Sequence, residues 1–200
     1  MLIKPVSFRC NLDCKYCYYK TLGEDSKEFR KLFPIQDIEE DGNLIEGSKI
    51  IMNEAVLKRL IKDYLDLDFP KKTFIWQGGE PLIAGLSFFK RVVDYQNQYV
   101  HFLKTKCGRY IKVINIIQTN GTLINKKWAR FFKENNILVG ISLDGPKDVN
   151  DPFRIFKTQK TRKTRKKAYG NRGTFDKIIN GIRMLNANEV DYNFLIVLHK

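Results

Sequence analysis

Short apolar, β-branched segments alternate with longer segments of helical periodicity along most of the chain, and this alternation constrains the fold more than any other feature. Parallel strands need long crossover connections, which are usually helical, so the pattern is typical of repeated β/α units around a parallel sheet. We therefore expect an α/β fold. The expected strands are residues 2–7, 72–77, 112–118, 137–143 and 192–199, and the expected helices are residues 53–67, 87–103, 125–135 and 174–186.

Two helix start signals and one long connection complete this prediction. Ser87 and Thr174 are expected to be N-caps, because their hydroxyl oxygens can accept hydrogen bonds from free amides of the first helical turn. Residues 21–52 are charged and weakly periodic, with turn signals. We expect a crossover of irregular or short helical structure there.

The size and composition of the chain fit one domain. Its 200 residues are 43% hydrophobic, which is enough for a buried core. No stretch approaches the roughly 18 consecutive apolar residues of a membrane span, and residues 1–5 are too short for a signal peptide. We expect a cytoplasmic protein without membrane contact. In that reducing compartment the four cysteines are expected to be metal ligands or reactive thiols, not a disulfide framework.

The net charge of +14 is unevenly distributed. Residues 157–172 contain eight Lys or Arg and no acidic residue, and we interpret them as an exposed basic loop inserted into the domain. This segment lacks the interleaved aromatic residues of a single-strand binding surface, and the chain lacks a helix-turn-helix or RNA-binding signature. Nucleic-acid binding is therefore not the favoured interpretation.

Three cysteines near the start of the chain have the spacing of a metal centre. Cys10, Cys14 and Cys17 form a C-x3-C-x2-C pattern, whose thiolates can all point at one soft metal centre. A structural zinc site or an ordinary iron-sulfur cluster uses four ligands, but Cys107 and both histidines are remote in sequence. The pattern favours a 4Fe-4S cluster with one open iron. Zinc and a redox pair of Cys14 with Cys17 are the alternatives, and Cys107 is expected to be an inert thiol.

Other polar motifs follow the predicted strands at their carboxyl ends. "QGGEP" (residues 77–81) follows the second strand, "QTNG" (118–121) the third and "SLDG" (142–145) the fourth, while the cysteines follow the first. In parallel β/α folds the loops at the carboxyl ends of the strands build the active site. The four motifs are therefore expected to meet at one rim of the sheet.

The cysteine motif "CNLDCKYCYY" resembles the signature of the radical S-adenosylmethionine (SAM) enzymes, in which the open iron chelates the methionyl amino and carboxyl groups of SAM. Four later stretches resemble, in the same order, the anaerobic sulfatase-maturating (SPASM-type) branch of that superfamily. The resemblance covers most of the chain except residues 21–49 and the basic run. The stretches are "FIWQGGEPLIAGLSFFKRVVDYQ", "IQTNGTLINKKWARFFKENN", "VGISLDGPKDVNDPFR" and "GTFDKIINGIRMLNANEVDYNFLIVL".

The resemblance implies two cofactors and a set of binding residues. Cys10, Cys14 and Cys17 would hold the 4Fe-4S cluster, and Gln77 is a candidate contact for a substrate peptide. The remaining implied residues bind SAM: Tyr16 beside the adenine and the cluster, Gly78, Gly79 and Glu80 in the motif that holds the methionyl group, Ser142 at the ribose and Arg154 at the carboxylate.

The resemblance also implies an activity and partners. Reductive cleavage of SAM would yield a 5′-deoxyadenosyl radical, which in the maturase branch oxidises a cysteine or serine of a sulfatase to formylglycine. The implied partners are a sulfatase-like protein or peptide substrate and an electron donor such as ferredoxin or flavodoxin. The alternatives are a radical SAM enzyme that modifies ribosomal peptides and a non-catalytic iron-sulfur or zinc-binding remnant.

The sequence departs from the family pattern in three places. Asn150 stands where the family has histidine, Pro152 lies within the same motif, and the basic run follows. The chain also ends after the fifth predicted strand, so we expect a partial (β/α)6 TIM-like barrel that is incomplete, with an open edge prone to association. The auxiliary-cluster domain and the catalytic aspartate of the family would lie beyond the chain. No catalytic residue is therefore assigned.

Overall fold

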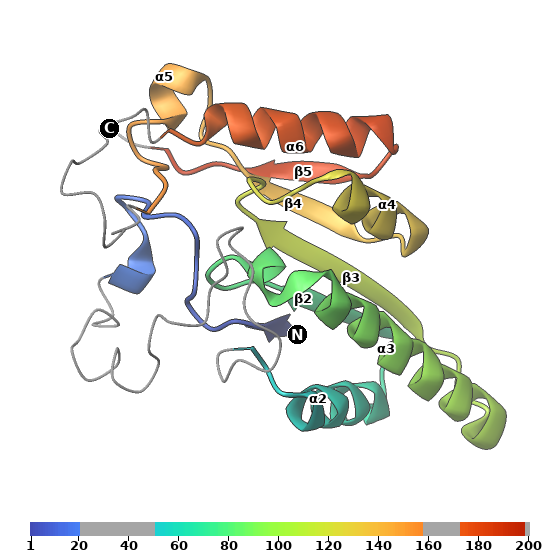
Figure 1. The fold of residues 1–200 in the computed structure, drawn as a ribbon. Helices are drawn as coiled ribbons and strands as arrows, with labels where there is room; N and C mark the ends of the chain where they lie inside the picture. Colours follow the sequence, from blue (N-terminus) through green and yellow to red (C-terminus); the bar gives the residue numbers. More distant parts are fainter. Residues whose placement is uncertain (21–50, 158–172, 199–200) are drawn as a thin grey trace.

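The computed structural model describes residues 1–20, 51–157 and 173–198. Five parallel strands in these residues form one sheet in the sequential order β1-β2-β3-β4-β5 (Figure 1). The predicted α/β fold with a parallel sheet is confirmed. The strands are β1 (Leu2–Ile3), β2 (Lys71–Trp76), β3 (Lys112–Thr119), β4 (Leu138–Ser142) and β5 (Tyr192–Leu195).

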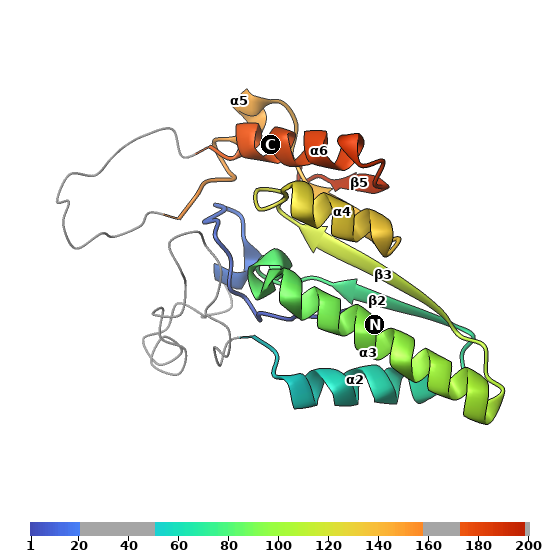
Figure 2. The same cartoon turned by 45° about the vertical axis from the view of Figure 1, so that its right-hand side comes forward.

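Four long helices pack against the same side of this sheet (Figures 1 and 2). Alternate strand residues, among them Trp76, Ile117 and Val139, are fully buried there, because successive side chains of a strand point to opposite faces. The ring of Trp76 meets the rings of Phe88 and Phe89 edge to face. The long helices are α2 (Glu54–Asp66), α3 (Gly85–Cys107), α4 (Lys126–Glu134) and α6 (Phe175–Ala187), and the short ones are α5 (Lys147–Asn150), η1 (Tyr18–Lys20) and η3 (Pro81–Ala84).

The register aligns the carboxyl ends of the strands at one rim. Ile3 pairs with Trp76, Trp76 with Ile117, and Ser142 with Leu195. The segments that follow the strands therefore begin close together. Figure 1 shows the segment after β1 (residues 4–17, the cysteine-bearing segment or cysteine loop), drawn in blue, beyond the arrowheads of the sheet.

The first and the last strand are much shorter than predicted, and β4 is one residue shorter at each end. The first was expected to reach residue 7, but β1 ends at Ile3, because Pro5 has no amide hydrogen for a ladder and Ser7 has a positive φ of 56°. The fifth was expected to reach residue 199, but β5 ends at Leu195. Beyond it the amide of Val197 donates to the Asp144 side chain, so the backbone leaves the ladder.

The predicted cap at Ser87 is wrong. Helix α3 continues directly from η3 and begins at Gly85, which places Ser87 inside the first turn. No side chain caps this helix, because the preceding 3-10 turn leads the backbone into it. The predictions at the starts of two other helices are closer, since Asn53 and Asn125 are the N-caps of α2 and α4.

Thr174 stands at the N-cap position of α6, but its side chain does not cap the helix. Its hydroxyl donates instead to the backbone oxygen of Arg154, 3.0 Å away. The carboxylate of Asp151 accepts from the amide of Phe175 at 2.8 Å and supplies the cap. Asp151, 24 positions before Phe175, thus does the work that the local pattern assigned to Thr174.

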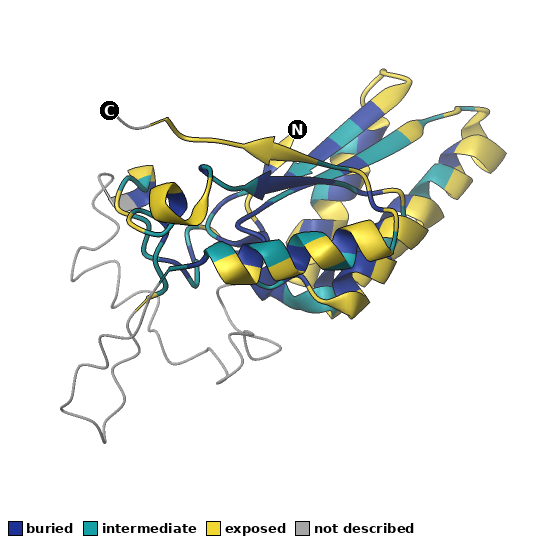
Figure 3. Ribbon diagram, turned by 90° about the horizontal axis from the view of Figure 1, so that it is seen from above, coloured by how far each residue is buried: buried dark blue, intermediate teal, exposed yellow. Residues whose placement is uncertain are grey.

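Strand β5 lies at an edge of the sheet and is poorly covered (Figure 3). Phe194, Leu195, Ile196 and Val197 are 41–56% exposed, and Leu198 is 89% exposed. The predicted association through this edge stays a prediction. No helix in the described ranges combines the length and apolar character needed to cross a membrane. Most of the predicted crossover at 21–52 and of the basic run at 157–172 lies outside the described residues.

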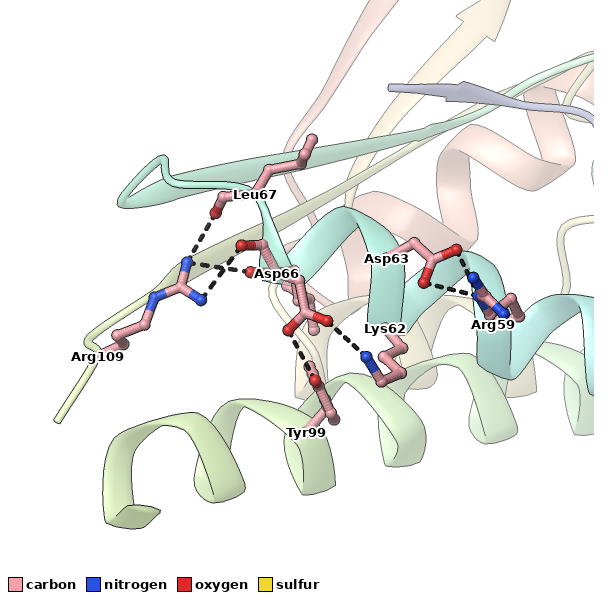
Figure 4. A network of polar contacts seen from close by, with 8 residues as sticks. Arg59, Lys62, Asp63, Asp66, Leu67, Tyr99 and Arg109 are labelled. Atoms are coloured by element: carbon pink, nitrogen blue, oxygen red, sulfur yellow. Dashed lines mark hydrogen bonds and ion pairs between the residues drawn. The ribbon is translucent and has the colours of Figure 1, made fainter. Parts of the chain in front are cut away.

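The carboxyl end of α2 is closed by a side chain from the loop between α3 and β3 (Figure 4). The guanidinium of Arg109 donates to the backbone oxygens of Leu65, Asp66 and Leu67, at 3.4, 3.3 and 2.7 Å. The last carbonyl groups of a helix have no partner within it and carry partial negative charge, so a cation stabilises them. Lys72 donates to the same Leu67 oxygen.

Replacing Arg109 with alanine should lower the free energy of unfolding by about 1–2 kcal/mol, because three charge-assisted bonds at a helix terminus are lost. Urea denaturation followed by circular dichroism measures this change. The control is Arg130→Ala at an exposed position of α4, which should change stability by less than about 0.5 kcal/mol. Equal losses in the two variants would contradict the capping role.

Candidate cofactor site

A cavity of about 380 Å³ opens at the rim where the strands end. All three cysteines of the N-terminal motif line it, together with residues from the ends of β2, β3 and β4. Every predicted binding residue except Glu80 is part of its wall. These wall residues are Cys10, Cys14, Cys17, Tyr16, Gly78, Gly79, Ser142 and Arg154, and Gln77, Thr119 and Asn120 lie beside them.

The first half of the cysteine-bearing segment packs against the Gly78–Gly79 turn. The amide of Glu80 donates to the backbone oxygen of Arg9 at 2.7 Å. A β-carbon at position 79 would overlap that same carbonyl group, and one at position 78 would lie 2.7 Å from Lys4 Cγ. Both glycines have positive φ angles. The backbone of the chain itself therefore requires glycine at these positions.

The second half of the segment pairs with residues 153–157, which follow α5. The two stretches run antiparallel and form an isolated bridge between Leu12 and Phe156. This pairing carries Arg154 to the cysteine loop, more than a hundred residues away in the sequence. The backbone bonds run from Asp13 N to Ile155 O (2.7 Å), from Lys15 N to Phe153 O (2.9 Å) and from Lys157 N to Asn11 O (3.1 Å).

Asp144 joins the two walls of the cavity, a role that the sequence did not reveal. The Asp144 side chain is fully buried. Its carboxylate accepts hydrogen bonds from Nε and Nη2 of Arg154 at 2.9 and 2.8 Å. It also accepts from the Tyr16 hydroxyl and from the Val197 amide. Burial raises the pKa of Asp144, but the bonds from Arg154 and Tyr16 outweigh it and hold that pKa below its ordinary value.

Tyr16 lies directly beneath this ion pair. The guanidinium carbon of Arg154 is 5.3 Å from the centre of the tyrosine ring, within the range of a cation–π contact. Burial, and after it the hydrogen bond to Asp144, raises the pKa of the Tyr16 hydroxyl, so the group stays protonated. The ring therefore presents a neutral aromatic surface beside the cysteines.

Glu80 lies behind the cavity wall and does not line it. Its fully buried carboxylate accepts from Thr119 Oγ1 and the Asn120 amide at 2.7 Å and from the Leu82 amide at 3.0 Å. Burial raises the pKa of Glu80 to about 7, although these three donors act in the opposite direction. Glu80 thus connects the end of β3 to the turn after β2. The structure gives it a supporting position, and its implied contact with SAM stays a prediction.

The position where the family has histidine is filled by Asn150, which is completely buried. Its side-chain oxygen accepts from the Asp144 amide at 3.4 Å, and its amide group donates to Thr174 Oγ1 and to Asp151 Oδ1 at 3.1 and 3.0 Å. Despite Pro152, the loop is held in place by these contacts. The asparagine fixes Asp144 and α6 relative to one another.

The donor set of the cavity fits an iron-sulfur cluster. Burial, and after it the charge of Glu80, raises the pKa of the Cys10 thiol to about 12, so a bound cation is needed to make it a thiolate. Within residues 1–20, 51–157 and 173–198, no three His, Cys, Asp or Glu side chains meet where a single metal ion could bind. A cluster differs from a single ion, because each cysteine ligates its own iron around a shared cavity.

A left-handed backbone conformation costs an ordinary residue about 1–2 kcal/mol. Gly79→Ala should lower the free energy of unfolding by far more than this cost. The added carbon must displace the backbone of Arg9, which leads into Cys10. Gly108→Ala is the matched control, with a similar φ of 64° and nothing within 4 Å of the added carbon. Thermal unfolding of both variants measures the difference, and equal losses would refute the crowding at position 79.

The raised pKa of Glu80 predicts a pH dependence of stability. The folded pKa of about 7 lies above the ordinary value of 4.5, so this contribution is complete below pH 4.5 and is lost as the pH rises through 7. The free energy of unfolding should therefore fall between pH 5 and pH 8, by about 3 kcal/mol at most. In Glu80→Gln the slope over this range should be flatter. Parallel slopes in urea titrations of the two proteins would rule out Glu80 as the titrating group.

The chain matches the radical SAM superfamily over residues 5–200. It is 37% identical over 200 residues to the cysteine-type anaerobic sulfatase-maturating enzyme of Clostridium novyi (strain NT), covering 100% of this chain and 44% of that protein. It is 34% identical to the serine-type anaerobic sulfatase-maturating enzyme of Bacteroides thetaiotaomicron, covering 100% of this chain and 39% of that one. The chain thus spans less than half the length of these relatives.

Comparison with solved structures gives the same family resemblance. The structure of native anSMEcpe with bound AdoMet superposes with a TM-score of 0.70 at 32% identity, over 98% of this chain and 42% of that one. The form with bound AdoMet and Cp18Cys peptide gives a TM-score of 0.71 over the same shares. The predicted resemblance to the sulfatase-maturating branch is confirmed. The cysteine motif, the rim cavity and the match along nearly its whole length place this chain in the radical SAM superfamily.

Proposed function

We propose that this chain forms the SAM-cleaving core of an enzyme of the anaerobic sulfatase-maturating type. The observation that carries the proposal is the single cavity that combines three cysteine thiols with the Gly78–Gly79 turn, Ser142 and Arg154. Similarity to maturases of both the cysteine and the serine type supports the branch. The proposed domain is a radical SAM core covering residues 1–200, with the basic run as an insertion.

In this proposal the chain binds two cofactors at the rim. Cys10, Cys14 and Cys17 hold a 4Fe-4S cluster, which supplies one electron for reductive cleavage of SAM when it is bound. Tyr16 offers a neutral aromatic face next to the cysteines. Gly79 and Ser142 line the same cavity and can hold polar groups of SAM.

Arg154 is positioned to bind a carboxylate of SAM while it stays paired with Asp144. Asp144 engages Nε and Nη2, so the Nη1 group lies outside that pair. Guanidinium groups present several donors in one plane and bind carboxylates through pairs of them. The bond from Asp144 fixes the plane of the guanidinium before the ligand arrives, which reduces the entropy lost on binding.

The substrate and partners follow from the relatives. A cysteine or serine side chain of a sulfatase-like peptide would enter the cavity, where Gln77 in the wall offers a polar contact. The chain would work in the cytoplasm with an electron donor such as ferredoxin or flavodoxin. A further domain with auxiliary clusters, of the kind implied by the family, would supply the catalytic base.

The proposed function predicts that the chain cleaves SAM once an iron-sulfur cluster has been reconstituted in it. The protein is loaded anaerobically with iron and sulfide, reduced with dithionite and mixed with SAM, and 5′-deoxyadenosine is measured by chromatography. The unmodified chain should form this product, and a variant with Cys10, Cys14 and Cys17 all replaced by alanine should form none. The Cys107→Ala variant is the control, because Cys107 is exposed at the end of α3 and should not affect the product.

The possible results separate the functions. Product in the unmodified chain and in Cys107→Ala supports the enzyme, and a sulfatase-derived peptide then tests the substrate by mass spectrometry. A bound cluster without product would refute SAM cleavage and favour a non-catalytic iron-sulfur protein. Failure to bind iron at all would refute the cluster assignment.

A further inference from the structure

Asn120 approaches a cysteine that the metal centre is proposed to use. Its side-chain nitrogen lies 3.7 Å from the sulfur of Cys10, within the distance of an N–H···S hydrogen bond. Asn120 is 7% exposed, so little water competes for this contact. The two residues are 110 positions apart in the sequence. Only the fold brings them together.

The orientation of the Asn120 amide is fixed by its neighbours. Its oxygen accepts from the Thr122 hydroxyl at 2.7 Å and from the Thr122 amide at 3.0 Å. Because two donors occupy the oxygen, the NH₂ group must be the end that faces Cys10. That group also donates to Asn11 Oδ1 at 2.8 Å, so both of its hydrogens can be used.

A closed ring of hydrogen bonds holds this arrangement. Asn120 donates to Asn11, Asn11 donates to Thr122 Oγ1 at 2.9 Å, and Thr122 donates back to Asn120. The backbone of Asn120 is held separately, because its amide donates to the buried carboxylate of Glu80. The donor that faces Cys10 is therefore fixed at both its side chain and its backbone.

The surroundings of Cys10 make such a donor important. Cys10 is half-buried and its sulfur is close to the negative charge of Glu80, and both conditions oppose additional negative charge on it. The Leu12 amide at 3.3 Å and the Asn120 side chain at 3.7 Å are N–H groups that oppose this effect. Hydrogen bonds to ligating sulfurs stabilise the reduced form of a cluster, which carries one more negative charge.

We infer that Asn120 is a positioning residue of the cluster: it donates a hydrogen bond to the ligating sulfur of Cys10 and thereby raises the reduction potential. This inference rests on the proposed function, since it requires a cluster on Cys10. It adds a residue outside the cysteine motif to those that control electron entry. Asn120 touches a cluster ligand and acts through it.

The test is redox titration of the reconstituted chain, monitored by the EPR signal of the reduced cluster. In Asn120→Leu, which has similar volume but no donor, the midpoint potential should become more negative. At a fixed solution potential the ratio of reduced to oxidised cluster should fall by about threefold to tenfold, and tenfold corresponds to 59 mV for one electron. An unchanged potential with full iron content would overturn the inference.

Asn11→Ala is the matched control for a purely structural effect. It opens the same ring and removes an anchor of the cysteine loop, but Asn120 keeps its bonds to Thr122 and can still donate to Cys10. Its ratio of reduced to oxidised cluster should change by less than about twofold. Equal shifts in Asn11→Ala and Asn120→Leu would show that Asn120 only anchors the loop.

A measurement on the unmodified sequence covers the case in which a variant does not fold. Protein labelled with ¹⁵N at asparagine side chains should show a ¹⁵N hyperfine coupling to the reduced cluster in pulsed EPR, and absence of that coupling would overturn the inference. If the unmodified chain binds no cluster, the proposed function fails and the inference fails with it. A cluster that forms normally but shows neither coupling nor a shifted potential refutes the inference alone.

Discussion

The site depends first on the burial of one carboxylate. Glu80 lies inside the protein, where an ionised group is costly unless donors surround it, and three donors from two segments do so. Its backbone amide extends the contact to a third segment through the oxygen of Arg9. The residue before Cys10, the turn after β2 and the end of β3 are therefore fixed relative to one another. The position of this cavity wall depends on these contacts of Glu80.

The opposite wall is organised by Asp144 in the same manner. Two buried acidic groups, each saturated with donors, thus hold the two sides of the rim, and neither depends on the sheet ladder alone. Between them the cysteine loop has little regular structure of its own. Its conformation comes from neighbours on both flanks, Gly79 on one and residues 153–157 on the other. Rigid elements at a distance thus position the loop that contains the three cysteines.

The sequence was sufficient for the features that depend on local pattern. The order of strands and helices, the parallel sheet and the meeting of four motifs at one rim follow from periodicity and from the geometry of parallel strands. Two predicted caps were wrong for different reasons. Ser87 does not cap a helix because the adjacent 3-10 turn leads directly into it, whereas Thr174 is replaced as a cap by Asp151, which is distant in sequence. The glycines of "QGGEP" line the cavity, but their tightest contacts are with the chain itself. A glycine in the sequence does not indicate which neighbouring group leaves no room for a side chain.

The pairing of the cysteine loop with residues 153–157 has a consequence for biosynthesis. The backbone partners that shape the cysteine loop are made more than a hundred residues after the loop itself. Contacts of such high sequence separation form late, because the intervening chain must first be ordered. While the intervening residues are being made, the three thiols are therefore present without the complete cavity that they line. The cavity is complete only after residues 153–157 have been made and have paired with the cysteine loop.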